Sequence, residues 1–175
     1  MGANSEVTGS NVNSLNPRGV GTVDVSGNYA LQTTYMGTSG NQTRSASSLD
    51  NSNWFIGDQG GMYTNGTNSA SPSGNIRGVK AFGGAMYVFT ASNNVPAVNT
   101  IDMLSGGSLT GIPGLPNNTN TNGQDFYLIQ SGDNGSLYDV LYVLAASSNA
   151  AGVISKFSLD GGSWAANGTY ATDFG

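Results

Sequence analysis

Cysteine and histidine are both missing from the 175 residues of this chain. Without them the chain has no disulfide, no thiolate metal site, no cysteine nucleophile and no histidine general base. A Ser-His-Asp triad is excluded for the same reason, so the many serines say little about catalysis. The lack of cysteine does not fix the cellular compartment, because exported bacterial proteins also avoid cysteine.

Charged side chains are scarce as well, at 9% of the residues, and the net charge is -5. The few basic residues are scattered along the chain: Arg18, Arg44, Arg77, Lys80 and Lys156. Because a phosphate backbone is bound by clustered positive charge, we expect no nucleic-acid partner. No apolar run approaches the roughly 20 residues of a membrane span, so we expect no membrane insertion.

Turn and strand formers dominate what is present. Glycine reaches 27 residues, and Asn, Ser and Thr fill much of the remainder, which leaves few strong helix formers. The composition therefore predicts an all-β protein with almost no helix. Low charge combined with Thr, Ser, Asn and Gly also favours an exported protein, located outside the cell or on its surface.

The clearest local pattern is a β-hairpin over Gly152–Tyr170. Polar and apolar residues alternate up to Leu159, and Asp160-Gly161-Gly162 then supplies residues that tolerate a positive φ. Gly19–Tyr35 repeats this pattern of two strands around a polar glycine turn. The repetition suggests that the same unit occurs more than once in the chain.

A second alignment supports the repeat. Arg44–Gly57 can be laid on Arg77–Thr90 without a gap, and a third copy begins at Gln124. Four antiparallel strands in about 40–45 residues is the size of one β-propeller blade. We therefore predict a partial propeller of antiparallel four-stranded blades, with a β-sandwich or a β-solenoid as the alternative fold.

The repeat also predicts how the chain is divided. We expect a flexible lead-in over residues 1–17 and a propeller-like segment over residues 18–175. That segment comprises half a blade at 18–36 and blades at about 42–74, 75–114 and 122–170. Because propellers usually carry four to eight blades, the missing ones would come from a longer chain or from another copy, with self-association through open sheet edges.

Four sequence motifs together carry a resemblance. They are W-F-I-G-D-Q-G-G-M-Y from Trp54, N-I-R-G-V-K-A-F-G-G-A-M-Y-V-F from Asn75, D-x-L-Y-V from Asp139, and the final hairpin from Gly152. Over residues 18–175 the chain resembles a group of exported bacterial β-propeller-like repeat proteins of undetermined activity. The resemblance implies a structural or ligand-binding module of a surface protein and no catalytic residue.

Aromatic side chains are the candidate ligand-binding residues. Trp54, Trp164 and Tyr63 would stack on sugar rings if they are exposed, although aromatic residues in a propeller more often pack between blades. A carbohydrate-binding or adhesion module, which would hold a carbohydrate or another surface protein, predicts an exposed tryptophan beside carboxamides. Burial of both tryptophans between sheets would count against it.

Acidic residues offer two weaker alternatives. Asp58 and Asp133 are candidate calcium ligands because carboxylates and turn carbonyls are hard oxygen donors, although no calcium-loop motif surrounds them. A glycosidase-like enzyme would need a carboxylate pair, for which Asp125, Asp133 and Asp139 are close in sequence. Ser131-x-Asp133-x-Gly135-x-x-Tyr138 resembles the structural Asp-box turn of sialidase-like propellers, which favours a turn over a catalytic pair.

Overall fold

A computed structural model describes residues 11–91, 98–102, 108–115, 123–147 and 150–173. The described chain is all-β, as the composition predicts, and its only helical element is the single 3₁₀ turn η1 (Val12–Ser14). No helix in these ranges has the length and apolar character needed to cross a lipid bilayer.

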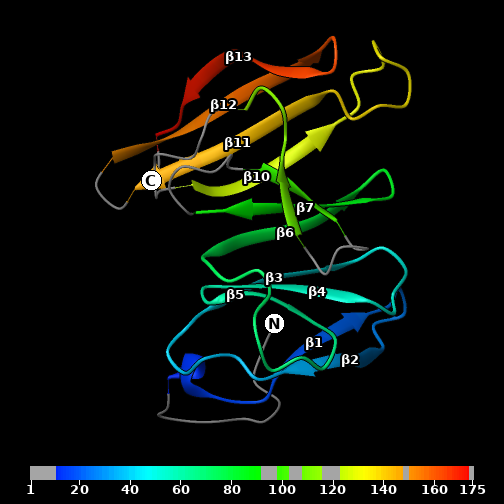
Figure 1. Cartoon of the computed structure of the whole chain (residues 1–175), viewed down its shortest axis with the longest axis vertical. Coiled ribbons are helices and arrows are strands. Elements are labelled where there is room, and N and C mark those ends of the chain that lie inside the picture. The colour runs from blue at the N-terminus through cyan, green and yellow to red at the C-terminus, as the bar shows by residue number, and fades with distance from the viewer. Residues whose placement is uncertain (1–10, 92–97, 103–107, 116–122, 148–149, 174–175) are drawn as a thin grey trace.

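In the ranges that the structure describes, thirteen strands form four separate antiparallel sheets (Figure 1). The first sheet contains β1 (Arg18–Val23) and β2 (Tyr29–Tyr35), and the second contains β3 (Thr43–Ser48), β4 (Trp54–Asp58) and β5 (Gly61–Thr64). The third contains β6 (Ile76–Phe82), β7 (Ala85–Thr90), β8 (Val98–Asp102) and β9 (Ser108–Gly111). The fourth contains β10 (Gly123–Ile129), β11 (Val140–Ser147), β12 (Ala150–Asp160) and β13 (Ser163–Ala171). Strand order follows chain order in every sheet, so the first sheet is a hairpin and the other three are meanders.

The hairpin expected at the end of the chain is confirmed. β12 pairs with β13 up to Asp160 opposite Ser163, and the loop between them is Gly161-Gly162. Both glycines have positive φ, 55° and 85°, as the favoured two-residue hairpin turn requires. Gly19–Tyr35 likewise forms the antiparallel pair β1–β2.

The second sheet differs from the expected four-stranded blade because it has three strands. Residues 70–74 run beside β5 in irregular form, with hydrogen bonds from Met62 N to Pro72 O at 3.0 Å and from Ser71 N to Met62 O at 2.8 Å. This stretch is rich in Ser, Pro and Gly and lacks alternating apolar residues, and Pro72 has no N–H to donate. It therefore borders the sheet through one isolated antiparallel bridge, Gly61 with Ser73, and adds no fourth strand.

Three apolar clusters hold consecutive sheets face to face. Between the first and second sheets lie Val20, Tyr35, Trp54, Ile56 and Tyr63. Between the second and third lie Phe55, Met62, Ile76, Val79, Met86 and Val88. Between the third and fourth lie Phe82, Phe89, Ile112, Leu115, Phe126, Leu128, Leu141, Phe157 and Trp164. The sheets are thus stacked in chain order along the longest axis of the molecule (Figure 1).

The first strands of the last three sheets lie side by side. Val79 N of β6 donates to Ser45 Oγ of β3 at 2.8 Å. Lys80, also on β6, donates to Phe126 O of β10 at 2.8 Å and pairs with Asp125 at 2.7 Å. One edge of the stack is therefore built from β3, β6 and β10, and the described sheets do not close into a ring.

Candidate functional site

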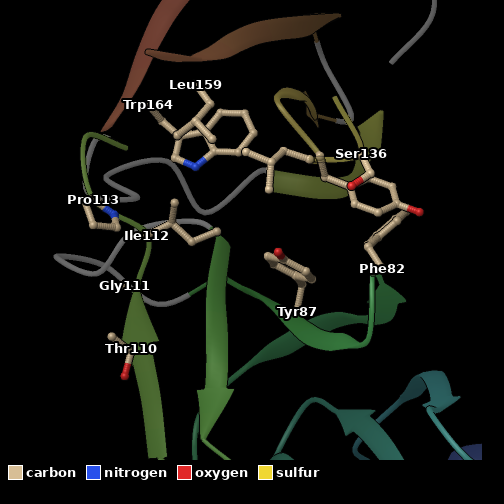
Figure 2. A pocket seen from close by; sticks show the side chains of 12 residues that line it. Phe82, Tyr87, Thr110, Gly111, Ile112, Pro113, Ser136, Leu159 and Trp164 are labelled. Carbon is tan, nitrogen blue, oxygen red and sulfur yellow. The ribbon is translucent and has the colours of Figure 1, made fainter. Parts of the chain in front are cut away.

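A cavity of about 390 Å³ lies between the third and fourth sheets (Figure 2). Ligand pockets in proteins usually measure roughly 300–1,000 Å³, so it has room for a small molecule. Its lining comes from both sheets and from the turn after β9: Phe82, Gly83, Tyr87, Thr110, Gly111, Ile112, Pro113, Ser136, Leu137, Tyr138, Leu159 and Trp164. Tyr87 and Trp164 approach the cavity from opposite sides (Figure 2).

Phe82 holds the aromatic wall together at the end of β6. Its ring lies edge-on to Tyr87 of β7 at 5.9 Å and to Tyr138, just before β11, at 5.4 Å. Edge-to-face contacts of this kind fix the rings relative to one another. Packing against Phe82 therefore positions Tyr87 and Tyr138 in the wall of the cavity. Both of these tyrosines are half-buried.

Trp164 forms the opposite wall and is anchored through its backbone. Its N–H donates to Pro113 O at 2.9 Å, which fastens the turn after β9 to β13. Gly114 in that turn has a φ of +86°, and a Cβ built there would lie 2.2 Å from Trp164 O. The close approach thus requires glycine, and it leaves Trp164 only 7% exposed.

The cavity is neutral. Among the described residues that line it there is no Asp, Glu, Lys or Arg. The hydroxyl-bearing residues of its lining are Tyr87, Thr110, Ser136 and Tyr138. Burial together with the nearby Tyr138 raises the pKa of Tyr87. Both effects favour the protonated tyrosine, so Tyr87 stays an uncharged hydrogen-bonding group at neutral pH.

The other two aromatic candidates lie elsewhere. Trp54 and Tyr63 belong to the cluster between the first and second sheets, where Trp54 is 8% exposed and the Tyr63 ring is 4.6 Å from that of Tyr35. The structure thus separates them from Trp164. Because both tryptophans are buried between sheets, the arrangement counts against an exposed tryptophan platform for sugars.

Asp58 lies in a closed polar network between the same two sheets. Its Oδ2 accepts from Arg18 Nη1 at 2.9 Å and from the Tyr35 hydroxyl at 2.8 Å, while its Oδ1 accepts from Gly60 N at 2.8 Å. The carboxylate is fully buried, and its charge is matched by Arg18. As a calcium ligand, Asp58 remains a prediction from sequence; the contacts described are those of a structural ion pair.

Arg18 also ties the start of the chain to this network. It donates to the backbone oxygens of Leu15 at 3.2 Å and Thr38 at 3.0 Å, and to that of Asn13. Residues 11–17, which the sequence places in a flexible lead-in, therefore include the ordered turn η1, fixed by a buried guanidinium.

Asp133 lies in the turn between β10 and β11, and the turn is organised by its neighbour Asp139. Asp139 accepts from Ser131 N at 2.7 Å, from Ser131 Oγ at 2.5 Å and from Asn134 Nδ2 at 3.0 Å. These hydrogen bonds lower the pKa of Asp139 to about 2. Asp133 itself is exposed and donates its N–H to Ser131 Oγ at 3.0 Å.

The three carboxylates considered for catalysis have distinct surroundings. Asp125 pairs with Lys80, Asp139 is enclosed by the turn, and Asp133 is exposed. In the ranges that the structure describes, no three acidic side chains gather as metal ligands. The cavity, whose lining residues converge from two sheets, is therefore taken as the candidate site.

Sequence reasoning named Trp164 as a ligand-binding candidate but did not place it beside its partners in the cavity. Tyr138 closes the D-x-G-x-x-Y pattern from Asp133, and Phe82 aligns with Leu49 in the repeat, so both carried a weak signal. Phe82, Tyr138 and Trp164 come together only because the third sheet packs on the fourth, and the spacing of residues in the sequence does not reveal that packing.

Comparison with known proteins does not add to this geometry. No protein family matches the chain, and neither does any curated protein or solved structure.

Proposed function

We propose that the chain is a β-propeller segment of an exported bacterial surface protein and acts as a binding module without catalysis. The stacked meanders support the propeller, because each sheet covers the face of the next and the first strands β3, β6 and β10 run along one edge. Propeller blades have this arrangement around their central channel. The low charge and the Thr, Ser, Asn and Gly content support export. The proposal requires no cofactor.

Burial of both tryptophans counts against the exposed platform expected of a carbohydrate-binding module, so the saccharide proposal rests on the cavity instead. The ligand that fits this cavity best is a neutral saccharide of one or two rings. The observation that carries this proposal is a cavity of about 390 Å³ with aromatic rings on two sides, whose described lining includes several hydroxyl-bearing residues and no charged one. Aromatic faces pack on the C–H surface of a sugar ring, and hydroxyl groups exchange hydrogen bonds with it. Trp164 would contribute the edge of its ring, because most of its surface is covered.

Saturation-transfer NMR with cellobiose, maltose and lactose tests this assignment. We expect at least one of these disaccharides to receive saturation from the parent protein. Tyr138→Phe and Tyr87→Phe should weaken binding about tenfold, since each removes one hydroxyl hydrogen bond from a buried site. Tyr29→Phe, on the exposed first sheet, is the matched control and should bind like the parent. No transfer to any of the three sugars would contradict the saccharide assignment.

A second candidate is a structural, self-associating role, and the two ends of the stack favour it. Tyr29 is 65% exposed on the first sheet, and Tyr170 is 55% exposed on the last. Apolar side chains at both ends would be covered by further blades or by a second copy. Light scattering over a concentration series tests self-association: assembly at higher concentration supports it, and a monomer throughout contradicts it.

A further inference from the structure

Arg44 and Arg77 occupy equivalent places on neighbouring strands. Arg44 is the second residue of β3 and lies at a register shift between Thr43 and Ser45. Arg77 is the second residue of β6 and lies at the corresponding shift after Ile76. In an antiparallel ladder such a shift is a bulge, which re-aims the extra side chain. The two strands are in direct contact, through the hydrogen bond from Val79 N to Ser45 Oγ.

In the fourth sheet, the residue at the equivalent register shift is uncharged. β10 has its own register shift between Gly123 and Asp125, and the extra residue there is Gln124. The positive charge is thus concentrated where β3 meets β6. Two of the five basic residues of an acidic chain are placed there together, against the net charge of -5.

The positive charge of Arg44 is poorly compensated. The nearby Asp58 is engaged by Arg18, Tyr35 and Gly60. In the described part of the chain, Arg44 Nε is buried and has no hydrogen-bond partner. Loss of water and the charge of Arg77 both lower the pKa of Arg44, and Asp58 only partly opposes them. A guanidinium in such surroundings gains most from an external acceptor that carries negative charge.

We propose that Arg44 and Arg77 together bind a small oxyanion, namely a sulfate, phosphate or carboxylate group, at the edge where β3 meets β6. Guanidinium groups present forked donors that match the oxygens of such anions. Both side chains are half-buried, so the anion reaches them from solvent while their stems stay packed. This site is separate from the neutral cavity, whose lining includes neither arginine.

NMR of the arginine Nε–Hε groups tests the proposal directly on the parent protein. Sodium sulfate, phosphate and acetate are titrated separately, with sodium chloride used to hold the ionic strength constant. We expect a saturable shift of the Arg44 signal with at least one of the three oxyanions. The preferred anion distinguishes a tetrahedral group from a carboxylate.

Matched variants locate the site. Arg44→Gln and Arg77→Gln should each weaken binding at least about tenfold, because each removes a charge-assisted hydrogen bond. Lys156→Gln removes the same charge from the half-buried face of β12 and should bind like the parent. If Arg44→Gln does not fold, Arg44→Lys keeps the charge and should bind several-fold more weakly. A parent protein without saturable shifts, or arginine variants that bind like Lys156→Gln, would overturn the proposal.

Discussion

Arg18 Nη1 and Asp58 Oδ2 lie 2.9 Å apart in a buried ion pair that joins the first sheet to the second. The pair lies 40 residues apart in sequence, and it is completed by the Tyr35 hydroxyl on the same carboxylate oxygen. Apolar residues fill the interface around it. The pair therefore fixes how β1–β2 is placed on its neighbour, and it adds a polar constraint to a mostly apolar contact.

Asp58→Asn should destabilise the protein strongly. The substitution leaves the Arg18 charge buried without its partner, which typically costs about 3–5 kcal/mol of unfolding free energy. Asp160→Asn, at the exposed end of β12, is the control and should change that free energy by less than about 0.5 kcal/mol. Urea unfolding measures both. Equal stability of the two variants would show that the ion pair does not carry the interface.

Tyr35 should make the fold sensitive to alkali. Burial is the main cause that raises the pKa of Tyr35 to about 12, from a model-compound value of 10.0. The unfolded chain loses this proton first as pH rises, so the stability from Tyr35 is complete below pH 10 and is lost towards pH 12. Tyr35→Phe should flatten this part of the unfolding profile, whereas Tyr29→Phe should preserve it. An unchanged slope in Tyr35→Phe would be inconsistent with a protected hydroxyl.

Asp139 should make the stability of the fold depend on pH in the acidic range. Hydrogen bonds from Ser131 and then Asn134 lower its pKa to about 2, below the ordinary 3.8. Its contribution to stability is therefore present above pH 3.8 and is lost as pH falls towards 2. Asp139→Asn should be less stable at neutral pH and should lose less stability than the parent on acidification. Asp133→Asn, in the same turn but exposed, should follow the parent; if it behaves like Asp139→Asn, the turn is organised differently.

Gly114→Ala should separate the turn after β9 from β13. Its φ is +86°, and the added Cβ would lie 2.2 Å from Trp164 O. Gly27→Ala is a matched control, because its φ is +82° and no atom lies within 4 Å of the added Cβ. We expect about 1–2 kcal/mol of destabilisation for Gly27→Ala from backbone strain, and roughly 1–3 kcal/mol more for Gly114→Ala from overpacking. Equal losses in thermal unfolding would contradict the close contact.

The sequence predicted local β-structure well because the relevant signals are local. The alternation of polar and apolar residues up to Leu159 and the turn residues Asp160-Gly161-Gly162 determine a hairpin independently of how the sheets pack. The all-β class followed from composition in the same way. The form of residues 70–74 could not be predicted in this way, because backbone hydrogen bonds to β5 hold them and their sequence has no strand pattern.

The sites were less predictable because they depend on contacts between sheets. The residue type alone made Trp164 a candidate. The other aromatic residues of the cavity wall include Phe82 and Tyr87, which lie about 80 residues earlier in the chain. Asp58 was considered as a metal ligand because sequence does not show Arg18 on the facing sheet. Likewise, alignment paired Arg44 with Arg77, whereas only the contact between β3 and β6 places their charges together.

Tryptophan fluorescence provides the most direct measurement of the proposed binding function. The chain has two tryptophans, so Trp54→Phe leaves Trp164, in the cavity wall, as the only one. We expect titration of this variant with cellobiose, maltose or lactose to change the Trp164 emission in a saturable manner, and Tyr138→Phe in the same background to weaken the response about tenfold. Emission that stays constant with all three sugars, in a variant shown to be folded, would contradict a saccharide-binding cavity.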